Sequence, residues 1–361
     1  MEEGEKKVNS ICFNKDFSQV LKTLILKKMI QADKNSLNNY KFIDLFAGIG
    51  GFHLALTSFG AECVFASEWD KHAAETYYRN FSIIPNGDIT KIKESDIPKH
   101  DILCGGFPCQ AFSISGKQKG FEDTRGTLFF DIARIVNFHK PKVLFLENVK
   151  NLAKHDNGNT LATIIQTLED LEYNVFHRVL NTSNFGLPQN RERIYIIAFH
   201  RSINSNSFSF PKPLANAVSL IDFLEKSPIN AKIIVRNDIE IYKNYSVSSS
   251  LFADVALTNK PIQIGIVNKG GQGERIYHPL GHAITLSAYG GGVGAKTGLY
   301  FINECVRKLS PRECARIQGF PDEFIINDID SQAYKQFGNS VSVNVLQHIL
   351  KEIVKVLEHN K

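Results

Sequence analysis

The segment Gly105–Ser113 holds Cys109, a thiol in a setting suited to chemistry. The residues Asp101–Cys104 before it predict a short apolar strand, which the two glycines at 105 and 106 would break. Pro108 fixes its own φ and disfavours a helical backbone at Phe107. The thiol is therefore expected on a stiff turn at the carboxyl end of a strand, where reactive groups collect in open α/β sheets. The alternative is a small buried hydrophobic side chain, as most free cysteines are.

A glycine-rich turn separates a predicted strand at 41–46 from a predicted helix at 52–59, and it contains Gly48, Gly50 and Gly51. Glycines at such a turn let a ligand approach the backbone closely. The alternative is a plain tight turn. His53 stands where the dinucleotide fingerprint requires Gly or Ala, so the pattern does not predict a pyrophosphate grip.

Acidic and aromatic side chains end the next strands. Glu68 and Trp69 follow the predicted strand 62–67, and Asp88 follows Asn86-Gly87 at the end of a predicted third strand. An acidic residue about twenty positions after the glycine turn is placed to bind ribose hydroxyls. Trp69, the only tryptophan, could stack on an adenine or belong to the core. The pattern predicts a cofactor that carries a nucleoside.

A carboxylate and two guanidiniums complete the candidate set. Glu147 ends the apolar run 143–146, which would place it on the same sheet edge as Cys109. Arg191 and Arg193 are two apart, so in an extended segment they would share a face and suit an anion. A surface glutamate and a solvated charge run are the alternatives.

The elements that must position these residues alternate between strands and helices from residue 41 to about 200. This alternation predicts an α/β fold with a doubly wound, mostly parallel sheet. Residues 201–260 show no clear period, and 261–300 are rich in glycine, which favours a smaller second domain of turns and short strands. Ser310, Pro311 and Glu313 predict a capped helix start. Residues 336–340 predict a polar turn that opens the last helix, which is expected at 343–357. The expected division is an extension at 1–40, a first α/β part at 41–205, a smaller domain at 206–309 and helices at 310–361 that complete the α/β part.

Composition narrows the class of protein. The 361 residues carry a net charge of +5, which permits a nucleic-acid partner without requiring one. Six scattered cysteines without a CxxC pair argue against a zinc site or a disulfide framework and favour the reducing cytoplasm. No run approaches eighteen apolar residues, so no membrane span is expected.

Taken together, the motifs resemble those of the bacterial DNA cytosine-C5 methyltransferases. Phe-x-Gly-x-Gly, Pro-Cys-Gln, Glu-Asn-Val, Gln-x-Arg-x-Arg and Gly-Asn-Ser occur in that family's order over residues 41–361, with 201–260 diverged. The resemblance implies a Rossmann-like catalytic domain, made of 41–205 and 310–361, that uses S-adenosylmethionine. It implies a target-recognition domain at 206–309. It also implies catalysis by Cys109, Glu147, Arg191 and Arg193. The cofactor site it implies comprises Phe46, Ala47, Gly48, Gly50, Gly51, Glu68, Trp69, Asp88, Ile89, Pro108, Leu128, Asn339 and Ser340.

The glycine-rich segments 270–277 and 285–292 resemble the recognition segments of a GCGC-specific member of that family. This implies methylation of the inner cytosine of GCGC after the base has left the duplex. The implied DNA contacts are Gln110, Ser115, Gln272, Arg275, Thr285 and Tyr289. The expected protein is a monomer on double-stranded DNA, with a cognate restriction endonuclease as a separate protein and no metal.

Three other functions remain open on the sequence. A tRNA cytosine methyltransferase of the same family would share the catalytic motifs, although the glycine-rich recognition segments favour DNA. A DNA-binding regulator without catalysis conflicts with the intact Cys109 and Glu147. A thiol redox enzyme would need a second cysteine near Cys109, and only Cys104, within the predicted strand, is close in sequence.

Overall fold

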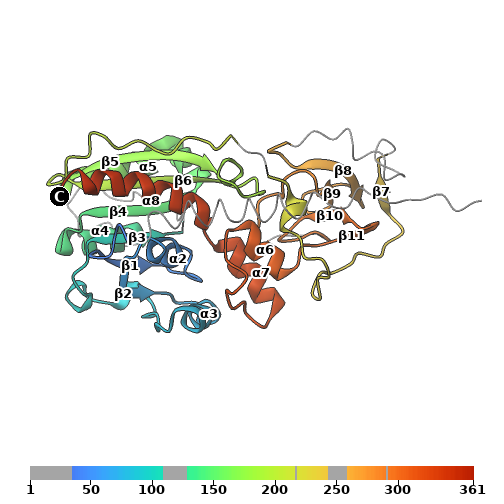
Figure 1. Cartoon of the computed structure of the whole chain (residues 1–361), viewed down its shortest axis with the longest axis horizontal. Helices are drawn as coiled ribbons and strands as arrows, with labels where there is room; N and C mark the ends of the chain where they lie inside the picture. The colour runs from blue at the N-terminus through green and yellow to red at the C-terminus, as the bar shows by residue number, and fades with distance from the viewer. Residues whose placement is uncertain (1–34, 109–127, 216–217, 243–257, 290–291) are drawn as a thin grey trace, which may run out of the picture.

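The computed structural model describes residues 35–108, 128–215, 218–242, 258–289 and 292–361. Cys109, Gln110, Ser115 and the extension before residue 35 lie outside the described residues. Figure 1 shows two sheets side by side, with the C-terminal helices α6 (Pro311–Ile317) and α7 (Asp330–Asn339) between them.

A six-stranded sheet has the strand order β2-β1-β3-β4-β6-β5. The strands β1 to β4 are parallel to one another, whereas β6 runs antiparallel to both of its neighbours. The prediction of a mostly parallel α/β sheet is thus confirmed. The strands are β1 (Lys41–Leu45), β2 (Glu62–Ser67), β3 (Ile102–Gly106), β4 (Val143–Val149), β5 (Tyr173–Asn181) and β6 (Glu192–His200).

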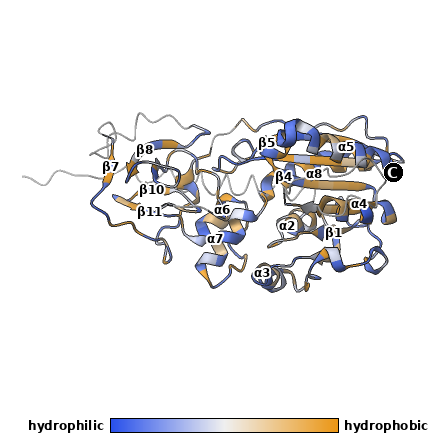
Figure 2. Cartoon of the chain, turned by 180° about the vertical axis from the view of Figure 1, so that it is seen from behind, coloured by the Kyte–Doolittle hydropathy of each residue, from blue (hydrophilic) through white to orange (hydrophobic). Residues whose placement is uncertain are grey.

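Helices cover both faces of this sheet because its central strands are apolar on both sides. One face packs on α2 (Gly51–Thr57) and α8 (Val343–Glu358), and the other on α4 (Leu128–His139) and α5 (Asn159–Asp170). The strand β4 is hydrophobic over 143–146, whereas α3 (Lys71–Phe81) at the margin of this part of the molecule is largely hydrophilic (Figure 2). The chain's last helix therefore completes the core around the first strands.

A second sheet has five strands in the order β11-β10-β9-β8-β7. It encloses a small apolar core that includes Ile264, Ile276 and Leu299. The entering and leaving segments pair beside β11: the Ile234 N–H donates to the Val306 carbonyl (2.8 Å) and the Lys308 N–H to the Lys232 carbonyl (3.0 Å). We call residues 232–308 the small lobe and the rest the large lobe. The strands are β7 (Ile239–Ile241), β8 (Ile262–Val267), β9 (Arg275–His278), β10 (Leu299–Ile302) and β11 (Cys305–Arg307).

The predicted helix start at Ser310 is confirmed. The Ser310 hydroxyl caps α6 (Pro311–Ile317) by accepting the Glu313 N–H (3.1 Å), and the Glu313 carboxylate accepts the Ser310 N–H (2.8 Å). This reciprocal capping box is a local sequence pattern, which explains why the start of α6 could be predicted.

Three local predictions were wrong. Gly105 and Gly106 do not break the strand but belong to β3, because a Cβ at Gly105 would lie 2.6 Å from the Leu45 carbonyl of β1. Asn86–Asp88 forms a single bridge to Ser67 rather than a third strand, and Asp88 caps a 3-10 turn. The segment 336–340 is not a turn opening the last helix: it ends α7 (Asp330–Asn339), and α8 begins only at Val343.

Candidate active site

A cavity of about 720 Å³ lies at the carboxyl ends of the parallel strands β1 to β4. It brings together predicted residues from segments distant in the sequence. Pro108, the residue before Cys109, is among them. The predicted residues that line the cavity are Phe46, Gly48, Glu68, Trp69, Asp88, Ile89, Pro108, Leu128, Glu147, Arg191, Arg193, Tyr289, Asn339 and Ser340.

The other described candidates do not line this cavity. A Cβ at Gly50 would meet the Phe81 ring at 2.1 Å and one at Gly51 would meet the Val341 side chain at 2.5 Å, so these glycines allow close packing of α2. The Thr285 hydroxyl donates to the Asn190 carbonyl (2.5 Å). The candidates outside the cavity are Ala47, Gly50, Gly51, Gln272, Arg275 and Thr285.

Glu68 organises one end of the cavity. Its carboxylate accepts the Gly48 N–H at Oε2 (2.8 Å) and the Asp70 N–H at Oε1 (2.7 Å). Burial raises the pKa of Glu68, and the two backbone N–H groups oppose that shift. Each oxygen can accept a further hydrogen bond, so Glu68 retains capacity for hydroxyl donors.

Aromatic surface lies beside this carboxylate. Trp69 lines the cavity with 81% of its surface exposed, which excludes the alternative that it belongs to the core. Phe46 lines the same cavity with a left-handed backbone, at φ 56°, so the chain turns sharply out of β1. Flat aromatic faces next to a mostly buried carboxylate fit a ligand that carries an aromatic base and ribose hydroxyls.

Glu147 lies in the opposite part of the site, within β4 and next to Gly106 of β3 in the register. Its side chain is 9% exposed, and its Oε1 forms an ion pair with Arg193 Nε (3.1 Å). Burial raises the pKa of Glu147, while the charges of Arg193 and Arg191 oppose this. Among the described residues, Oε1 makes no hydrogen bond besides this ion pair, so the carboxyl group retains capacity to bind a substrate.

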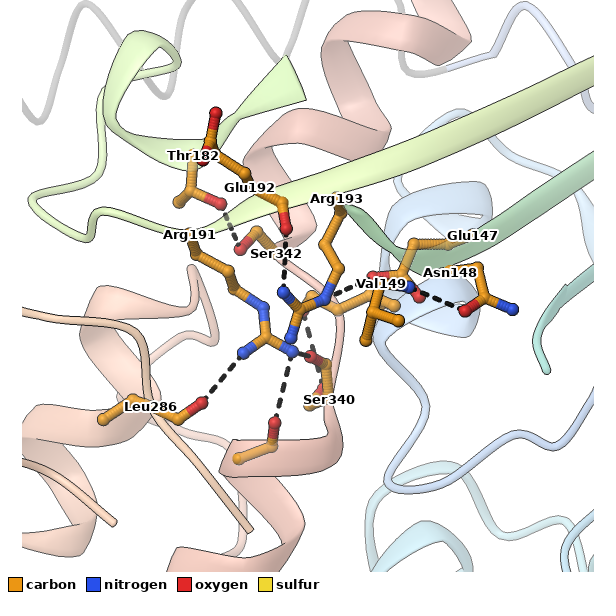
Figure 3. Close-up of polar contacts among 12 residues, drawn as sticks. Glu147, Asn148, Val149, Thr182, Arg191, Glu192, Arg193, Leu286, Ser340 and Ser342 are labelled. Carbon is orange, nitrogen blue, oxygen red and sulfur yellow. Dashed lines mark hydrogen bonds and ion pairs between the residues drawn. The ribbon is translucent and has the colours of Figure 1, made fainter. Parts of the chain in front are cut away.

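Arg191 lines the same cavity as Glu147 and Arg193, but its guanidinium binds backbone carbonyls instead of the carboxylate (Figure 3). Its guanidinium donates to the carbonyls of Leu286 (3.1 Å), Gly338 (3.2 Å) and Ser340 (2.6 Å), and it is 2% exposed. It therefore connects the strand β6 to the small lobe and to the end of α7. The sequence placed both arginines on one face but did not reveal this division between a carbonyl-binding and a carboxylate-binding guanidinium.

Several cavity residues were missed by the sequence argument. Asn148 donates from Nδ2 to the Phe107 carbonyl (2.9 Å), which fixes the backbone just before Pro108. The position of Asn148 within the Glu-Asn-Val motif could have identified it as a site residue. Asp70 and Lys335 also line the cavity and form an ion pair of 2.7 Å. No local pattern joins residues so far apart in the sequence.

Other parts of the described chain offer less. A cavity of about 520 Å³ near Arg316 and Asp322 contains none of the predicted residues. No group of three or more metal-ligating side chains occurs among the residues that the structure describes. Within those same ranges, no helix is both long and apolar enough to cross a membrane.

Comparison with known proteins decides the family. The C-5 cytosine-specific DNA methylase family matches residues 40–355. The chain belongs to the C-5 cytosine-specific DNA methylases. The methylase is 56% identical to the type II methyltransferase M.HhaI of Haemophilus parahaemolyticus over 326 residues, which cover 90% of this chain and 97% of that relative. It is 45% identical to the type II methyltransferase M.HpaII of Haemophilus parainfluenzae, over 91% of this chain and 92% of that one.

Solved structures confirm the Rossmann-like fold of the methylase. The Dnmt2 methyltransferase of S. pombe superposes with a TM-score of 0.62 at 18% identity, covering 88% of this chain and 99% of that chain. The Entamoeba histolytica methyltransferase EhMeth gives 0.62 at 18% identity, with 88% and 98% covered. The family makes this chain a DNA cytosine-5 methyltransferase.

Proposed function

We propose that this enzyme methylates carbon 5 of the inner cytosine of GCGC in duplex DNA, with S-adenosylmethionine as the donor, as the methylase of a restriction–modification system. One observation carries the proposal. A single cavity holds Glu68 and Trp69 in one part, Glu147 and Arg193 in another, and Pro108, which precedes Cys109, among its lining residues.

The proposed chemistry starts from the weak nucleophilicity of carbon 5. A thiolate from Cys109 adds to carbon 6, which makes carbon 5 enamine-like. The Glu147 carboxyl hydrogen-bonds the N3 and amino edge of the base and provides a proton at N3 during the addition. Its raised pKa supports this role because a protonated carboxyl can donate. After methyl transfer, a base, proposed to be water, removes the carbon 5 proton. The thiolate then leaves carbon 6 and the proton on N3 returns to the Glu147 carboxylate.

The cofactor would lie against Glu68, Trp69 and Phe46, with the Glu68 carboxylate on the ribose hydroxyls and Asp88 near the adenine amino group. What S-adenosylmethionine supplies when bound is an electrophilic methyl group on a sulfonium. The cavity's remaining predicted residues, including Asn339 and Ser340, would bound this part of the site.

Sequence choice is proposed to reside in segments 270–277 and 285–292. Gln272 and Ser115 would fill the gap left by the extruded cytosine, and Arg275, Thr285 and Tyr289 would contact the DNA. Tyr289 is 76% exposed, which suits a contact residue. A few base contacts of about 1–3 kcal/mol each suffice for strict choice.

Digestion of plasmid from a host that expresses the enzyme tests the recognition sequence. A nuclease that cuts only unmodified GCGC should leave this plasmid intact, and bisulfite sequencing should map the methyl group to the inner cytosine. Complete cutting with methylation at another motif would reject GCGC and leave the reaction class unaffected.

The nucleophile is tested separately with DNA that carries 5-fluorocytosine at the target. The wild type should form a covalent adduct, because the proton that must leave is replaced by fluorine. Cys109→Ser should form none while still binding DNA and cofactor. An adduct with the serine variant, or none with the wild type, would reject the assignment.

A further inference from the structure

An ion pair crosses the wall of the cavity between two helices. Lys335 Nζ of α7 lies 2.7 Å from Asp70 Oδ2, just before α3, and both side chains line the cavity. Neither residue has a place in the chemistry proposed above. The hydrogen bond with Asp70 raises the pKa of Lys335, so the ammonium keeps its charge.

Asp70 connects this pair to the start of α3. Its Oδ1 accepts the N–H groups of His72 and Ala73 (3.0 Å each), which caps the helix. Its own N–H donates to Glu68 Oε1 (2.7 Å). The other carboxylate oxygen of Glu68 holds the Gly48 N–H (2.8 Å). A series of contacts therefore links the Lys335 ammonium through Asp70 to the Glu68 carboxylate and the glycine turn.

The remaining contacts between α3 and the C-terminal segment do not depend on this pair. Gln336 Oε1 accepts the Thr76 hydroxyl (3.2 Å), and Gln336 Nε2 donates to the His72 carbonyl (3.0 Å). Asn80 binds both backbone groups of Ile325. We therefore expect the helices to stay packed when the ion pair is removed, and a pair whose side chains are 29% and 26% exposed to contribute little to stability.

We propose that Lys335 is a positioning residue for the cofactor: through Asp70 it fixes the start of α3 and the Glu68 carboxylate in the orientation that cofactor binding requires. This inference rests on the proposed use of S-adenosylmethionine. It predicts that loss of the pair weakens cofactor binding more than it destabilises the fold.

Four single substitutions test the positioning role of Lys335. Lys335→Met removes the charge and keeps the aliphatic stem, while Lys335→Arg keeps a cation that can still reach Asp70. Asp70→Asn weakens the pair but preserves a good helix cap. Arg79→Met is the matched control, because Arg79 of α3 pairs with Asp328 (3.1 Å) in the same interface but does not line the cavity.

Calorimetry with S-adenosylhomocysteine and the full chain, without DNA, gives the dissociation constants. Lys335→Met and Asp70→Asn should each weaken S-adenosylhomocysteine binding about 3- to 30-fold. The double variant should bind no more weakly than the single variant with the lower affinity, because both changes remove the same contact. Lys335→Arg should retain most of the wild-type affinity. Arg79→Met should bind like the wild type. The melting temperatures of the ligand-free single variants should stay near that of the wild type.

Wild-type affinity in both Lys335→Met and Asp70→Asn would overturn the positioning role, as would additive losses or a fall in melting temperature that accounts for the weakened binding. If Lys335→Met does not fold, Asp70→Asn decides by the same criteria. A wild type that does not bind S-adenosylhomocysteine at all would instead overturn the proposed cofactor.

Discussion

At the scale of single residues, Glu147 and Arg193 show how burial and charge oppose each other. Burial favours the neutral carboxyl, and the guanidinium at 3.1 Å favours the charged one. The resulting pKa lies above the usual range for glutamate. Such a carboxyl can hold a proton closer to neutral pH than a surface glutamate, which is the condition for protonating a bound base.

Glu147→Gln should therefore abolish most of the reaction. The amide can still donate a hydrogen bond but cannot release a proton, so single-turnover methyl transfer should slow by about 10²–10⁴-fold. Cofactor affinity, measured by calorimetry, serves as the control and should change little, because Glu68 binds at another part of the cavity. A rate within tenfold of the wild type would contradict this role.

Several site residues could be predicted from the sequence, because acidic, aromatic and thiol side chains stand beside turn residues at the ends of predicted strands. Glu68, Trp69 and Glu147 were found in this way, and all line one cavity. The partners could not be predicted. Lys335 joins Asp70 only because α7 packs against α3, and that juxtaposition depends on the tertiary fold.

At the scale of elements, the helix α7 and the segment 286–289 of the small lobe approach each other through Gly338. A Cβ there would lie 2.3 Å from the Ala288 nitrogen and 2.3 Å from the Ser287 carbonyl carbon. The carbonyls of Leu286 and Gly338 both bind Arg191. Close contact of two backbones thus sets the geometry around a buried guanidinium.

Gly338→Ala should destabilise the protein even though alanine favours helices by about 1 kcal/mol. The overlap with backbone atoms cannot be relieved by a side-chain rotation, so we expect a net loss of about 1–3 kcal/mol. Urea unfolding measures it. The control is Gly87→Ala, where a Cβ meets nothing within 4 Å and stability should stay within about 0.5 kcal/mol of the wild type. Equal stability of the two variants would reject the explanation.

Elements with strong apolar periods and caps were predictable, whereas glycines gave ambiguous signals. The strand at 62–67 was found because a short apolar run is a local signal, and the helix starting at Pro311 because its capping box is local too. Gly105 and Gly106 were taken as strand breakers, but they permit close strand approach. Gly338 was taken as part of a turn, yet it lies in α7, where the small lobe leaves no room for a side chain. Both errors depend on neighbours distant in sequence.

At the scale of the whole molecule, buried histidines link stability to pH. Burial lowers the pKa of His53 and of His100 to about 4, and His53 also stacks on Phe81 with ring centroids 3.9 Å apart. An unfolded histidine titrates near 6.5. Between these two values the unfolded chain binds more protons than the folded one, so the free energy of unfolding rises with pH in this window and levels off above it.

His53→Gln tests this linkage. Each such histidine removes up to about 3 kcal/mol of stability when the pH falls through the window. The gain in the free energy of unfolding from pH 4.5 to pH 7.5 should therefore be smaller in His53→Gln than in the wild type. The comparison between the two proteins cancels the contribution of the carboxylates. Identical pH profiles would contradict the assignment of a buried, neutral His53.

The paired entry and exit of the small lobe have an evolutionary consequence. Because the Lys232 carbonyl accepts the Lys308 N–H, the lobe is a closed excursion whose two ends are neighbours in space. A different segment with adjacent ends could be inserted at the same point without lengthening any connection in the catalytic sheet. The cavity would keep Glu68 and Glu147 provided that the contacts of 281–289 with the large lobe were preserved. These include the Leu286 carbonyl, which binds Arg191, and the pairing of Ala283 with Pro188 and Asn190. If sequence choice resides in this lobe, as proposed, exchange of the segment would change recognition while the catalytic residues are inherited intact.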